Sequence, residues 1–301
     1  MNLRDLSYIV AVAELKSFVK AADRCFVSQP TLSMQIKKLE ESLGVKIFER
    51  NNKRVLITDI GADIISKAKL ILQNADDITE LANNAQQPLA GNLRLGAFPT
   101  LAAYILPDLV PLIKNELPDL RLILIEEKTD TLIKQLKDGE IDAALLAAPI
   151  KSDALTFTTL FDDAFKLAVS SQHHLSNKST VTPADIIGEP LLLLDEGHCL
   201  RDQALQFCQL NGAKEEQNVR ATSLETLRQM VRANTGITFI PEVAIRDTDN
   251  DNNIQYIPFE KPQPKRTICL VWRKTSPKKQ LMDLLTQLLQ NFYDNKLTNH
   301  R

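Results

Sequence analysis

Residues 17–50 read SFVKAADRCFVSQPTLSMQIKKLEESLGVKIFER, and this stretch decides the fold of the N-terminal part of the chain. Its pattern predicts a helix, a tight turn and a second helix. Ser28 is a good N-cap for the second helix, and Pro30 falls in its first turn, where a missing N–H costs nothing. We expect the buried face of that helix to consist of Leu32, Ile36, Leu39 and Leu43.

The exposed face of the same helix is suited to binding DNA. Short polar side chains lie at its N-terminal end and lysines lie behind them, as in recognition helices that read base edges and bind phosphates. A strand pair follows, and its cations would reach the minor groove or the DNA backbone. The residues that we expect to contact DNA are Ser28, Gln29, Pro30, Thr31, Ser33, Lys37, Arg50 and Lys53. The alternative is a solvated helix face in a three-helix domain.

Composition and charge are those of an ordinary soluble chain. The 301 residues are 44% hydrophobic and 25% charged, and the net charge is −2. Residues 1–60 carry 10 Lys and Arg against 7 Asp and Glu, a mild excess that agrees with a nucleic-acid-binding end. No apolar run reaches the about 18 residues of a membrane span, and the first residues lack the apolar core of a signal peptide. We therefore expect a cytoplasmic protein with no membrane partner.

A long helix is predicted after residues 53–58, KRVLIT, which alternate like a short strand. From there to about residue 86, apolar residues recur seven positions apart at Ile57, Ile64, Ile71, Ile78 and Ala85. This heptad seam favours a dimerisation helix, and the alternative is an amphipathic helix packed on its own domain. Pro88 and Gly91 then end the helix and mark a hinge.

From residue 92 onward, apolar strands alternate with helices. The first strand reads NLRLGA, and helices are predicted from Thr100, Asp130 and Ser223 and over 277–295. Continuous apolar strands separated by helices predict parallel-rich sheets that are covered on both faces. In such sheets, ligands bind beyond the carboxyl ends of the strands, where helices begin. One cleft would bring together four polar helix starts, at Thr100, Thr129–Asp130, His198–Cys199 and Thr222–Ser223.

Two of the four cysteines lie nine positions apart in GHCLRDQALQFC, residues 197–208. If Cys199 to Cys208 is one helix, its ends lie roughly 13.5 Å apart along the axis, whereas a disulfide needs Cα atoms about 4.4–6.8 Å apart. The pair is therefore either two inert core thiols or a switch that unravels the helix. We expect Cys25 and Cys269 to be small core hydrophobes. The cysteine spacing indicates neither a disulfide scaffold nor a structural metal site.

The segment AADRCFVSQPTLSMQIKKLEESLGVKIFER resembles the winged helix-turn-helix of LysR-type transcriptional regulators, and the resemblance continues over essentially the whole chain. Within that family, LLLLDEGHCLRDQALQFC and ATSLETLRQMV resemble the peroxide-sensing members. The resemblance implies an α plus α/β fold with a winged helix-turn-helix at 1–58, a dimerisation helix at 59–88 and a two-lobed, periplasmic-binding-protein-like α/β regulatory domain at 89–301. Lobe I would comprise about 92–162 and 268–301, and lobe II about 163–267.

The same resemblance gives roles to the two cysteines of the GHC(x8)C motif. It implies that Cys199 is the peroxidatic sensor thiolate, that Cys208 is the resolving thiol, and that dimers assemble into a homotetramer on double-stranded DNA. Cys199 lies at a predicted helix start with His198 and Arg201 close by, so we expect its thiol to ionise at neutral pH. Cys208 lies on the apolar stripe of the same helix, and we expect it to be buried.

These roles predict a two-step oxidation. Cys199 attacks hydrogen peroxide to give a sulfenic acid, and Cys208 condenses with it to a disulfide. Because the helix forbids that bond, the segment must rearrange locally, and the lobe surface then changes the dimer contacts. A glutaredoxin- or thioredoxin-like cellular dithiol would reset the switch. RNA polymerase is a further expected partner, and no cofactor or metal is indicated.

Cleavage of the peroxide also needs hydrogen-bond donors for the departing hydroxide. The resemblance implies a pocket made of Thr100, Thr129, His198, Asp202 and Arg266. Each has an ordinary alternative: the threonines would be N-caps, His198 and Asp202 would cap the Cys199 helix, and Arg266 would be a surface cation that opens a strand. Arg228 is expected to form an intramolecular salt bridge.

Three functional hypotheses follow. The first is a transcriptional activator of oxidative-stress genes, not an enzyme, that hydrogen peroxide switches through Cys199. The second keeps the DNA-binding end but places a small metabolite between the lobes, which is the usual mode in the family. The third is a thiol peroxidase or reductase, and the helix-turn-helix argues against it.

Overall fold

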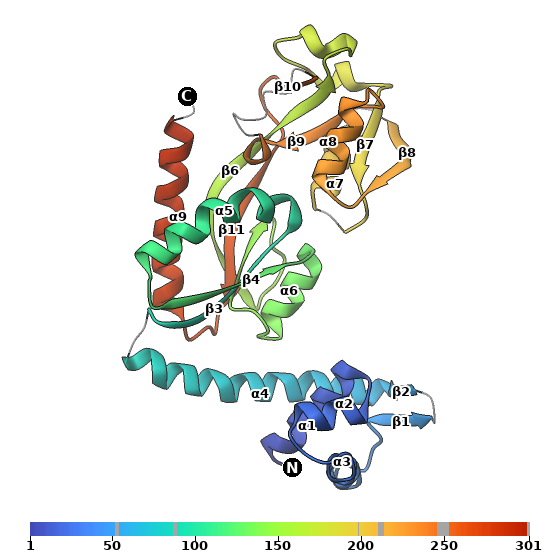
Figure 1. Cartoon of the computed structure of the whole chain (residues 1–301), viewed down its shortest axis with the longest axis vertical. Helices are drawn as coiled ribbons and strands as arrows, with labels where there is room; N and C mark the ends of the chain where they lie inside the picture. Colours follow the sequence, from blue (N-terminus) through green and yellow to red (C-terminus); the bar gives the residue numbers. More distant parts are fainter. Residues whose placement is uncertain (52–53, 87–88, 198, 210–213, 246–252, 300–301) are drawn as a thin grey trace. The chain divides into compact units, whose positions relative to one another are not determined.

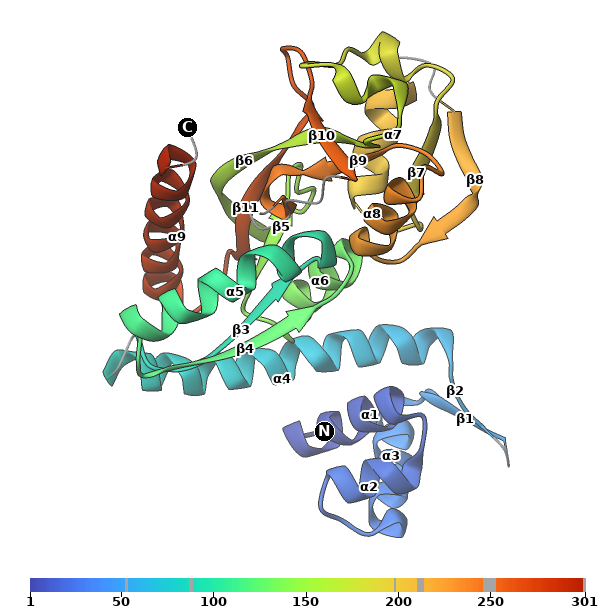
Figure 2. The ribbon, with the colours of Figure 1, turned by 45° about the horizontal axis from the view of Figure 1, so that its top comes forward.

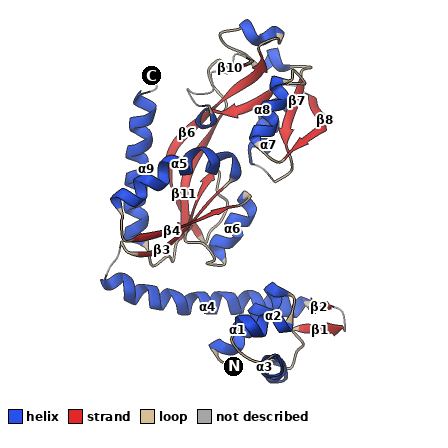
Figure 3. Ribbon diagram, in the orientation of Figure 1, coloured by secondary structure: helices blue, strands red, loops and turns tan. Residues whose placement is uncertain are grey.

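The computed structural model describes residues 1–301 except 52–53, 87–88, 198, 210–213, 246–252 and 300–301. The chain divides into two units, Met1–Gln87 and Pro88–Arg301 (Figure 1). The first is mostly helical with one short strand pair, and the second mixes helices and strands (Figure 3). Among the described residues, no helix is long and apolar enough to cross a membrane.

The first unit is a helix-turn-helix followed by a strand pair and a long helix. Its elements are α1 (Leu3–Leu15), α2 (Phe18–Arg24), α3 (Gln29–Leu43), β1 (Phe48–Asn51), β2 (Arg54–Ile57) and α4 (Asp59–Gln86). Ser28 caps α3, since its Oγ accepts from the Thr31 N–H at 3.3 Å, and Pro30 lies in the first turn. β1 and β2 pair antiparallel as a wing. The predicted winged helix-turn-helix is confirmed.

The buried face of α3 agrees with the predicted stripe at three of its four positions. Leu32, Ile36 and Leu39 are buried in a core that they share with α1 and α2. The prediction for Leu43 is wrong, because this side chain is 40% exposed. Leu43 is the last residue of α3, and Gly44 then turns the chain away from the core in a left-handed conformation with φ 70°.

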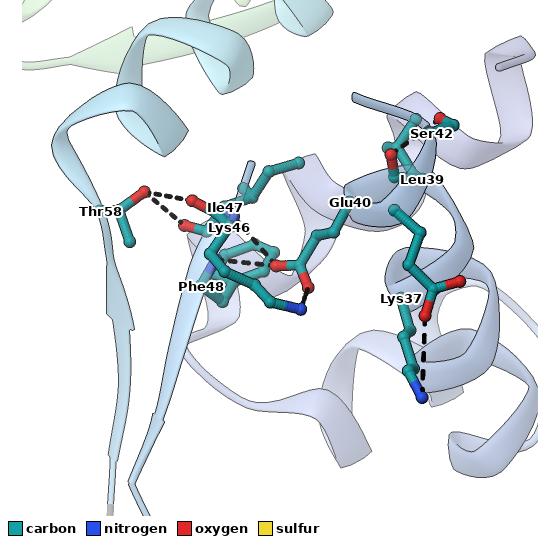
Figure 4. Close-up of polar contacts among 9 residues, drawn as sticks. Lys37, Leu39, Glu40, Ser42, Lys46, Ile47, Phe48 and Thr58 are labelled. Carbon is teal, nitrogen blue, oxygen red and sulfur yellow. Dashed lines mark hydrogen bonds and ion pairs between the residues drawn. The ribbon is translucent and has the colours of Figure 1, made fainter. Parts of the chain in front are cut away.

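Glu40 ties α3 to the wing (Figure 4). Its Oε1 accepts from the N–H groups of Ile47 at 2.9 Å and Phe48 at 3.2 Å, and its Oε2 accepts from Lys46 Nζ at 3.1 Å. Thr58 Oγ1 donates to the Lys46 carbonyl at 2.6 Å, which fixes the chain after β2 beside the chain before β1. Burial by itself raises the pKa of Glu40. The hydrogen bonds from Phe48, Lys46 and Ile47 outweigh burial, so that pKa lies below its usual value.

The long helix α4 packs on α1 at its start and leaves apolar side chains exposed further along. Ile65 and Ala68 are buried in the core of the first unit. Ile71 and Ile78, which belong to the predicted heptad seam, are exposed. One helix over the predicted range is confirmed. Ile64 of the seam packs against the core of the first unit, whereas the exposure of Ile71 and Ile78 agrees with a dimerisation role for the later part of the helix.

The second unit is built on a seven-stranded sheet in the order β10-β6-β11-β5-β3-β4, in which β9 also pairs with β6. Its strands are β3 (Gly91–Ala97), β4 (Leu120–Glu126), β5 (Ala143–Ala147), β6 (Leu155–Ser170), β9 (Thr238–Pro241), β10 (Ile254–Pro258) and β11 (Lys265–Arg273). β3 pairs in parallel with β4 and β5, but β6 and β11 pair antiparallel with all their neighbours. The expected parallel-rich arrangement is therefore wrong for this sheet, because β11 returns from the C-terminal end and inserts between β5 and β6. β7 (Pro190–Leu194) and β8 (Lys214–Ala221) form a separate parallel pair.

The strands β6 and β11 run from one hydrophobic core into another (Figures 1 and 2). Residues 93–161 and 268–293 contribute to the first core, and residues 165–259 contribute to the second. The first core is covered by α5 (Pro99–Glu116), α6 (Thr129–Lys137) and α9 (Lys279–Asn299), and the second by α7 (Cys199–Gln209) and α8 (Leu224–Arg232). Short 3₁₀ helices are η1 (His174–Asn177), η2 (Pro183–Ile186) and η3 (Glu242–Ala244). The two-lobed architecture is confirmed.

We expect Glu40→Ala to destabilise the first unit by about 2 kcal/mol or more, because the buried N–H groups of Ile47 and Phe48 lose their acceptor. Urea unfolding of the full chain measures this change. Glu41→Ala is the matched control, since Glu41 is exposed and only pairs with Lys37 at 3.7 Å.

The same pair of variants has a predicted pH dependence. Because folding lowers the pKa of Glu40, its stabilisation is present above the unfolded pKa and is lost as the pH falls through the folded pKa. The gap between wild type and Glu40→Ala should therefore shrink on acidification. Equal stability of the Glu40 and Glu41 variants at neutral pH would contradict the anchoring role.

Candidate functional site

Arg266 is the charged centre of a polar cluster that lies where the two cores of the second unit meet. It is the second residue of β11 and only 1% exposed. Its Nε and Nη2 lie 2.9 Å from Asp163 Oδ2, Nη1 donates to Thr100 Oγ1 at 3.0 Å, and Nη2 donates to the Thr100 carbonyl at 3.1 Å. The guanidinium carbon is 5.0 Å from the ring centre of Phe98 and 5.9 Å from that of Phe165. Arg266 is therefore no surface cation.

Asp163, which the sequence analysis missed, holds the guanidinium in place. It lies on β6 directly opposite Arg266 in the antiparallel register of β6 and β11. Its Oδ1 accepts from the Val243 N–H at 3.1 Å, so both carboxylate oxygens are engaged. Burial raises the pKa of Asp163, and the Arg266 charge and the Val243 N–H oppose that effect. A lone charge at this depth is strongly unfavourable, so each member of the pair requires the other.

Cys199 is the first residue of α7 and packs against the first core, although its helix packs on the second. Burial raises the pKa of its thiol; the Arg266 charge, a hydrogen bond from Thr129 and the Leu200 N–H lower it. The nearby Asp202 charge raises it again, and the resulting pKa lies above that of an ordinary thiol. The expectation of a thiol ionised at neutral pH is wrong for this structure, because desolvation outweighs the helix start and the cation.

Two further buried polar atoms lie at the start of α6 and in α7. Thr129 begins α6, and its buried Oγ1 has no partner of ordinary geometry among the described residues, so its hydrogen bond to the Cys199 sulfur is longer or less well aligned than usual. Gln203 lies one turn after Cys199 on the same face of α7, and its buried Oε1 also has no partner in the described part of the chain. Gln203 was not among the predicted residues, although its spacing of four from Cys199 was a usable signal. The thiol and the Thr129 hydroxyl together suit a small polar molecule.

Three of the four predicted helix starts meet at this site. The side chains of Thr100, Thr129 and Cys199, from α5, α6 and α7, all contact or electrostatically influence the Arg266 cluster. The N-cap interpretation of the threonines is wrong, because Phe98 and residue 128 occupy the cap positions of α5 and α6. The fourth start does not join them: Ser223 is an exposed N-cap of α8.

Three other residues considered in the sequence, Asp202, His198 and Arg228, do not join the Arg266 cluster in the described part of the structure. Asp202 lies exposed in the first turn of α7. Its negative charge raises the pKa of Cys199. His198 lies outside the described residues. Arg228 is buried, and its Nε lies 3.5 Å from Glu225 Oε2, which confirms the expected salt bridge.

The cysteines occupy three different settings. Cys199 and Cys208 both lie within α7, so the predicted helix between them is confirmed, while the side chain of Cys208 lies outside the described residues. The stripe that buries α7 includes Leu200 and Ala204. Cys269 is a core residue of β11, and Cys25 is partly buried at the end of α2. Burial raises the pKa of both of these thiols.

The loop before α7 is held by side chains that the sequence analysis did not single out for this purpose. Lys128, just before α6, donates from Nζ to the Glu196 carbonyl at 2.7 Å. Gly197 has φ 84°, and a Cβ there would lie 3.1 Å from Lys128 Cδ. Arg201 donates from Nη1 to the Leu194 carbonyl at 3.1 Å at the other side of the loop. These contacts fix the position at which α7 begins.

The predicted DNA-binding residues surround the N-terminus of α3. Exposed members are Ser28, Gln29, Pro30 and Lys37, and partly buried members are Thr31 and Ser33. The Ser28 and Thr31 hydroxyls are hydrogen-bonded at 2.7 Å. The Arg50 side chain and Lys53 lie outside the described residues. Phe26, almost fully exposed with φ 55°, lies beside this surface and was not predicted.

Two protein-family models match the chain. Residues 3–62 match the bacterial regulatory helix-turn-helix protein of the lysR family, and residues 86–293 match the LysR substrate binding domain. The chain belongs to the LysR family. The resemblance seen in the sequence is thereby confirmed, and this LysR-family protein is a DNA-binding regulator rather than an enzyme.

Similar proteins span nearly the whole of this LysR-family chain. It is 42% identical over 290 residues to the DNA-binding transcriptional dual regulator OxyR of Escherichia coli K12, covering 96% of this chain and 95% of the relative. It is 44% identical over 277 residues to a hydrogen peroxide-inducible genes activator of Haemophilus influenzae, covering 92% of each. Full-length OxyR from Pseudomonas aeruginosa matches with TM-score 0.79 and 36% identity over 96% of this chain and 95% of that one. An oxidised form of OxyR matches with TM-score 0.64 and 40% identity over 69% of this chain and 98% of that one.

We predict that removing the Arg266 charge raises the pKa of Cys199. The double variant Asp163→Asn, Arg266→Gln removes both charges, so no buried ion is left alone. The pH dependence of Cys199 alkylation should move to higher pH, and alkylation at pH 7 should slow. Asp162→Asn, Lys265→Gln is the matched control, because this neighbouring pair, 2.6 Å apart, is exposed. An unshifted profile in the first variant would refute the electrostatic role of Arg266.

Proposed function

We propose that this LysR-family protein is a peroxide-sensing transcriptional activator whose switch is Cys199. The observation that carries the proposal is the position of Cys199, partly buried beside Arg266 and Thr129 at the start of the helix that also contains Cys208. The relatives support it, because they are named hydrogen peroxide-inducible genes activators and match over more than nine-tenths of the chain. Reduced and oxidised OxyR structures are both among the similar folds.

The first step is attack on hydrogen peroxide. Cys199 loses its proton, the sulfur forms a bond with one peroxide oxygen, and the O–O bond breaks. The second oxygen leaves as hydroxide and takes up a proton to become water. Arg266 and Thr129 stabilise the thiolate and offer hydrogen bonds to the departing oxygen.

The partly buried position of Cys199 suits this chemistry in spite of the raised pKa. A thiolate of higher pKa is intrinsically more nucleophilic, and thiolate formation is favoured locally by the Arg266 charge. The partly buried position favours a small, uncharged oxidant over bulky disulfides.

The second step is disulfide formation. The Cys208 sulfur attacks the sulfenic sulfur of Cys199, the S–O bond breaks and water leaves. In α7 the two residues are roughly 13.5 Å apart along the axis, and a disulfide needs about 4.4–6.8 Å between Cα atoms. The helix must therefore unravel. A helix of 11 residues has little stability of its own, so the bonds that hold the loop before it set the barrier.

The oxidised segment then alters the surface of the second unit. We propose that this change rearranges the subunits of a dimer-based tetramer on double-stranded DNA and promotes contact with RNA polymerase. A dithiol protein of the glutaredoxin or thioredoxin type restores the reduced form by thiol–disulfide exchange. The exposed seam of α4 is the surface that supports subunit pairing in this account.

The proposal predicts the products of oxidation in each cysteine variant. After one equivalent of hydrogen peroxide, mass spectrometry of the wild type should find a Cys199–Cys208 disulfide, that is, the loss of two hydrogen atoms. Cys208→Ser should stop at the sulfenic acid, with one added oxygen on Cys199. Cys199→Ser should stay unmodified and lose the transcriptional response, and Cys25→Ser is a control that should behave as the wild type.

Three outcomes would contradict the proposal. Unchanged thiols in the wild type would exclude peroxide sensing at this site. A Cys199→Ser variant that keeps its response to an effector would favour the alternative, in which a small metabolite binds between the lobes. Steady multiple turnover of peroxide with a thiol reductant would point to a peroxidase.

A further inference from the structure

A second group of polar side chains, none of them in the cysteine helix, gathers near the start of β7. It consists of His173 and His174 at the start of η1, and Glu189 just before β7. His173 Nε2 lies 3.2 Å from one Glu189 oxygen, and His174 Nε2 lies 3.4 Å from the other. The three ligand atoms all lie within 4.8 Å of one another. The chain has only four histidines, and two of them meet at this carboxylate.

The arrangement is held by the local fold. His173 caps η1, and its Nδ1 accepts from the Leu175 N–H at 3.3 Å, which turns Nε2 towards Glu189. The two imidazole rings lie against each other, with centres 4.4 Å apart and planes inclined by 33°. His173 and Glu189 are 13% and 19% exposed, whereas His174 is 66% exposed. One side of the cluster is thus fixed by the protein and the other faces solvent.

The three side chains are close enough to bind one metal ion. Two ligands with bonds of about 2.0–2.1 Å in tetrahedral geometry lie about 3.3 Å apart. Here the two imidazole nitrogens lie 3.2 and 3.4 Å from different oxygens of Glu189, so that the carboxylate lies beside both rings. Two imidazoles and one carboxylate suit Zn²⁺, Fe²⁺, Co²⁺, Ni²⁺ or Cu²⁺, whereas Mg²⁺ and Ca²⁺ prefer oxygen ligands alone. The exposed side leaves room for water as a further ligand.

We propose that His173, His174 and Glu189 bind one divalent transition-metal ion. On binding, the ring proton of His173 passes from Nε2 to Nδ1, and the 3.3 Å hydrogen bond from Leu175 ends. That bond is long, and its loss is smaller than the gain from a metal–imidazole bond. The bound ion joins η1 to the start of β7 and stabilises the second core. The proposal is independent of the peroxide switch, because these residues take no part in it.

The test is a Co²⁺ titration of untagged, full-length protein from which metals have been removed with a chelator. We expect one Co²⁺ per chain, a d–d absorption spectrum without a thiolate charge-transfer band, and displacement by Zn²⁺. His174→Ala should weaken binding by at least about tenfold. Glu189→Gln, which keeps hydrogen-bonding atoms beside both rings, should weaken it as well. Gln172→Ala, at an exposed neighbouring position, is the matched control and should bind as the wild type does.

Three results would each overturn the proposal. The first is no saturable binding by the wild type. The second is a thiolate charge-transfer band, which would place the metal on cysteine. The third is equal affinity of the wild type and the His174→Ala variant, which is expected to fold because His174 is exposed.

Discussion

The buried ion pair between Arg266 and Asp163 is the interaction on which the site of this protein depends. It joins β11 to β6 at the point where both strands pass from one core to the other, and it adds Thr100 from α5. Neither charge is stable there without its partner. Because the pair is fixed on three elements, the guanidinium stays beside Cys199 in one orientation, and its charge favours the thiolate there.

The chemistry of Cys199 comes from two opposing effects of its position between the cores. Desolvation raises the pKa of the thiol, while Arg266 and Thr129 favour the thiolate once it forms. The same position gives α7 contacts with both cores. Cys199 packs on the first core, while Leu200 and Ala204 pack on the second. A short helix held in this way can unravel when the disulfide forms. A helix packed inside a single core would resist that change.

Features that depend on neighbouring residues were predictable from the sequence, and features that depend on strand register were not. The cap at Ser28, the long helix after residue 58 and the helix that contains both thiols follow from local patterns. Asp163 lies 103 residues from Arg266, and only the β6–β11 register brings them together. The same insertion of β11 explains why a mixed sheet forms. The raised pKa of Cys199 was also not predicted, because segments that are distant in the sequence desolvate the start of α7.

Hydrogen–deuterium exchange of the full-length protein tests the central claim, that α7 must unravel for the thiols to meet. The reduced protein should protect the amides of α7 and of β11. After one equivalent of hydrogen peroxide, the α7 amides should exchange faster while those of β11 keep their protection, and Cys208→Ser should show no such loss. Equal protection of α7 before and after the Cys199–Cys208 disulfide has formed would contradict the account.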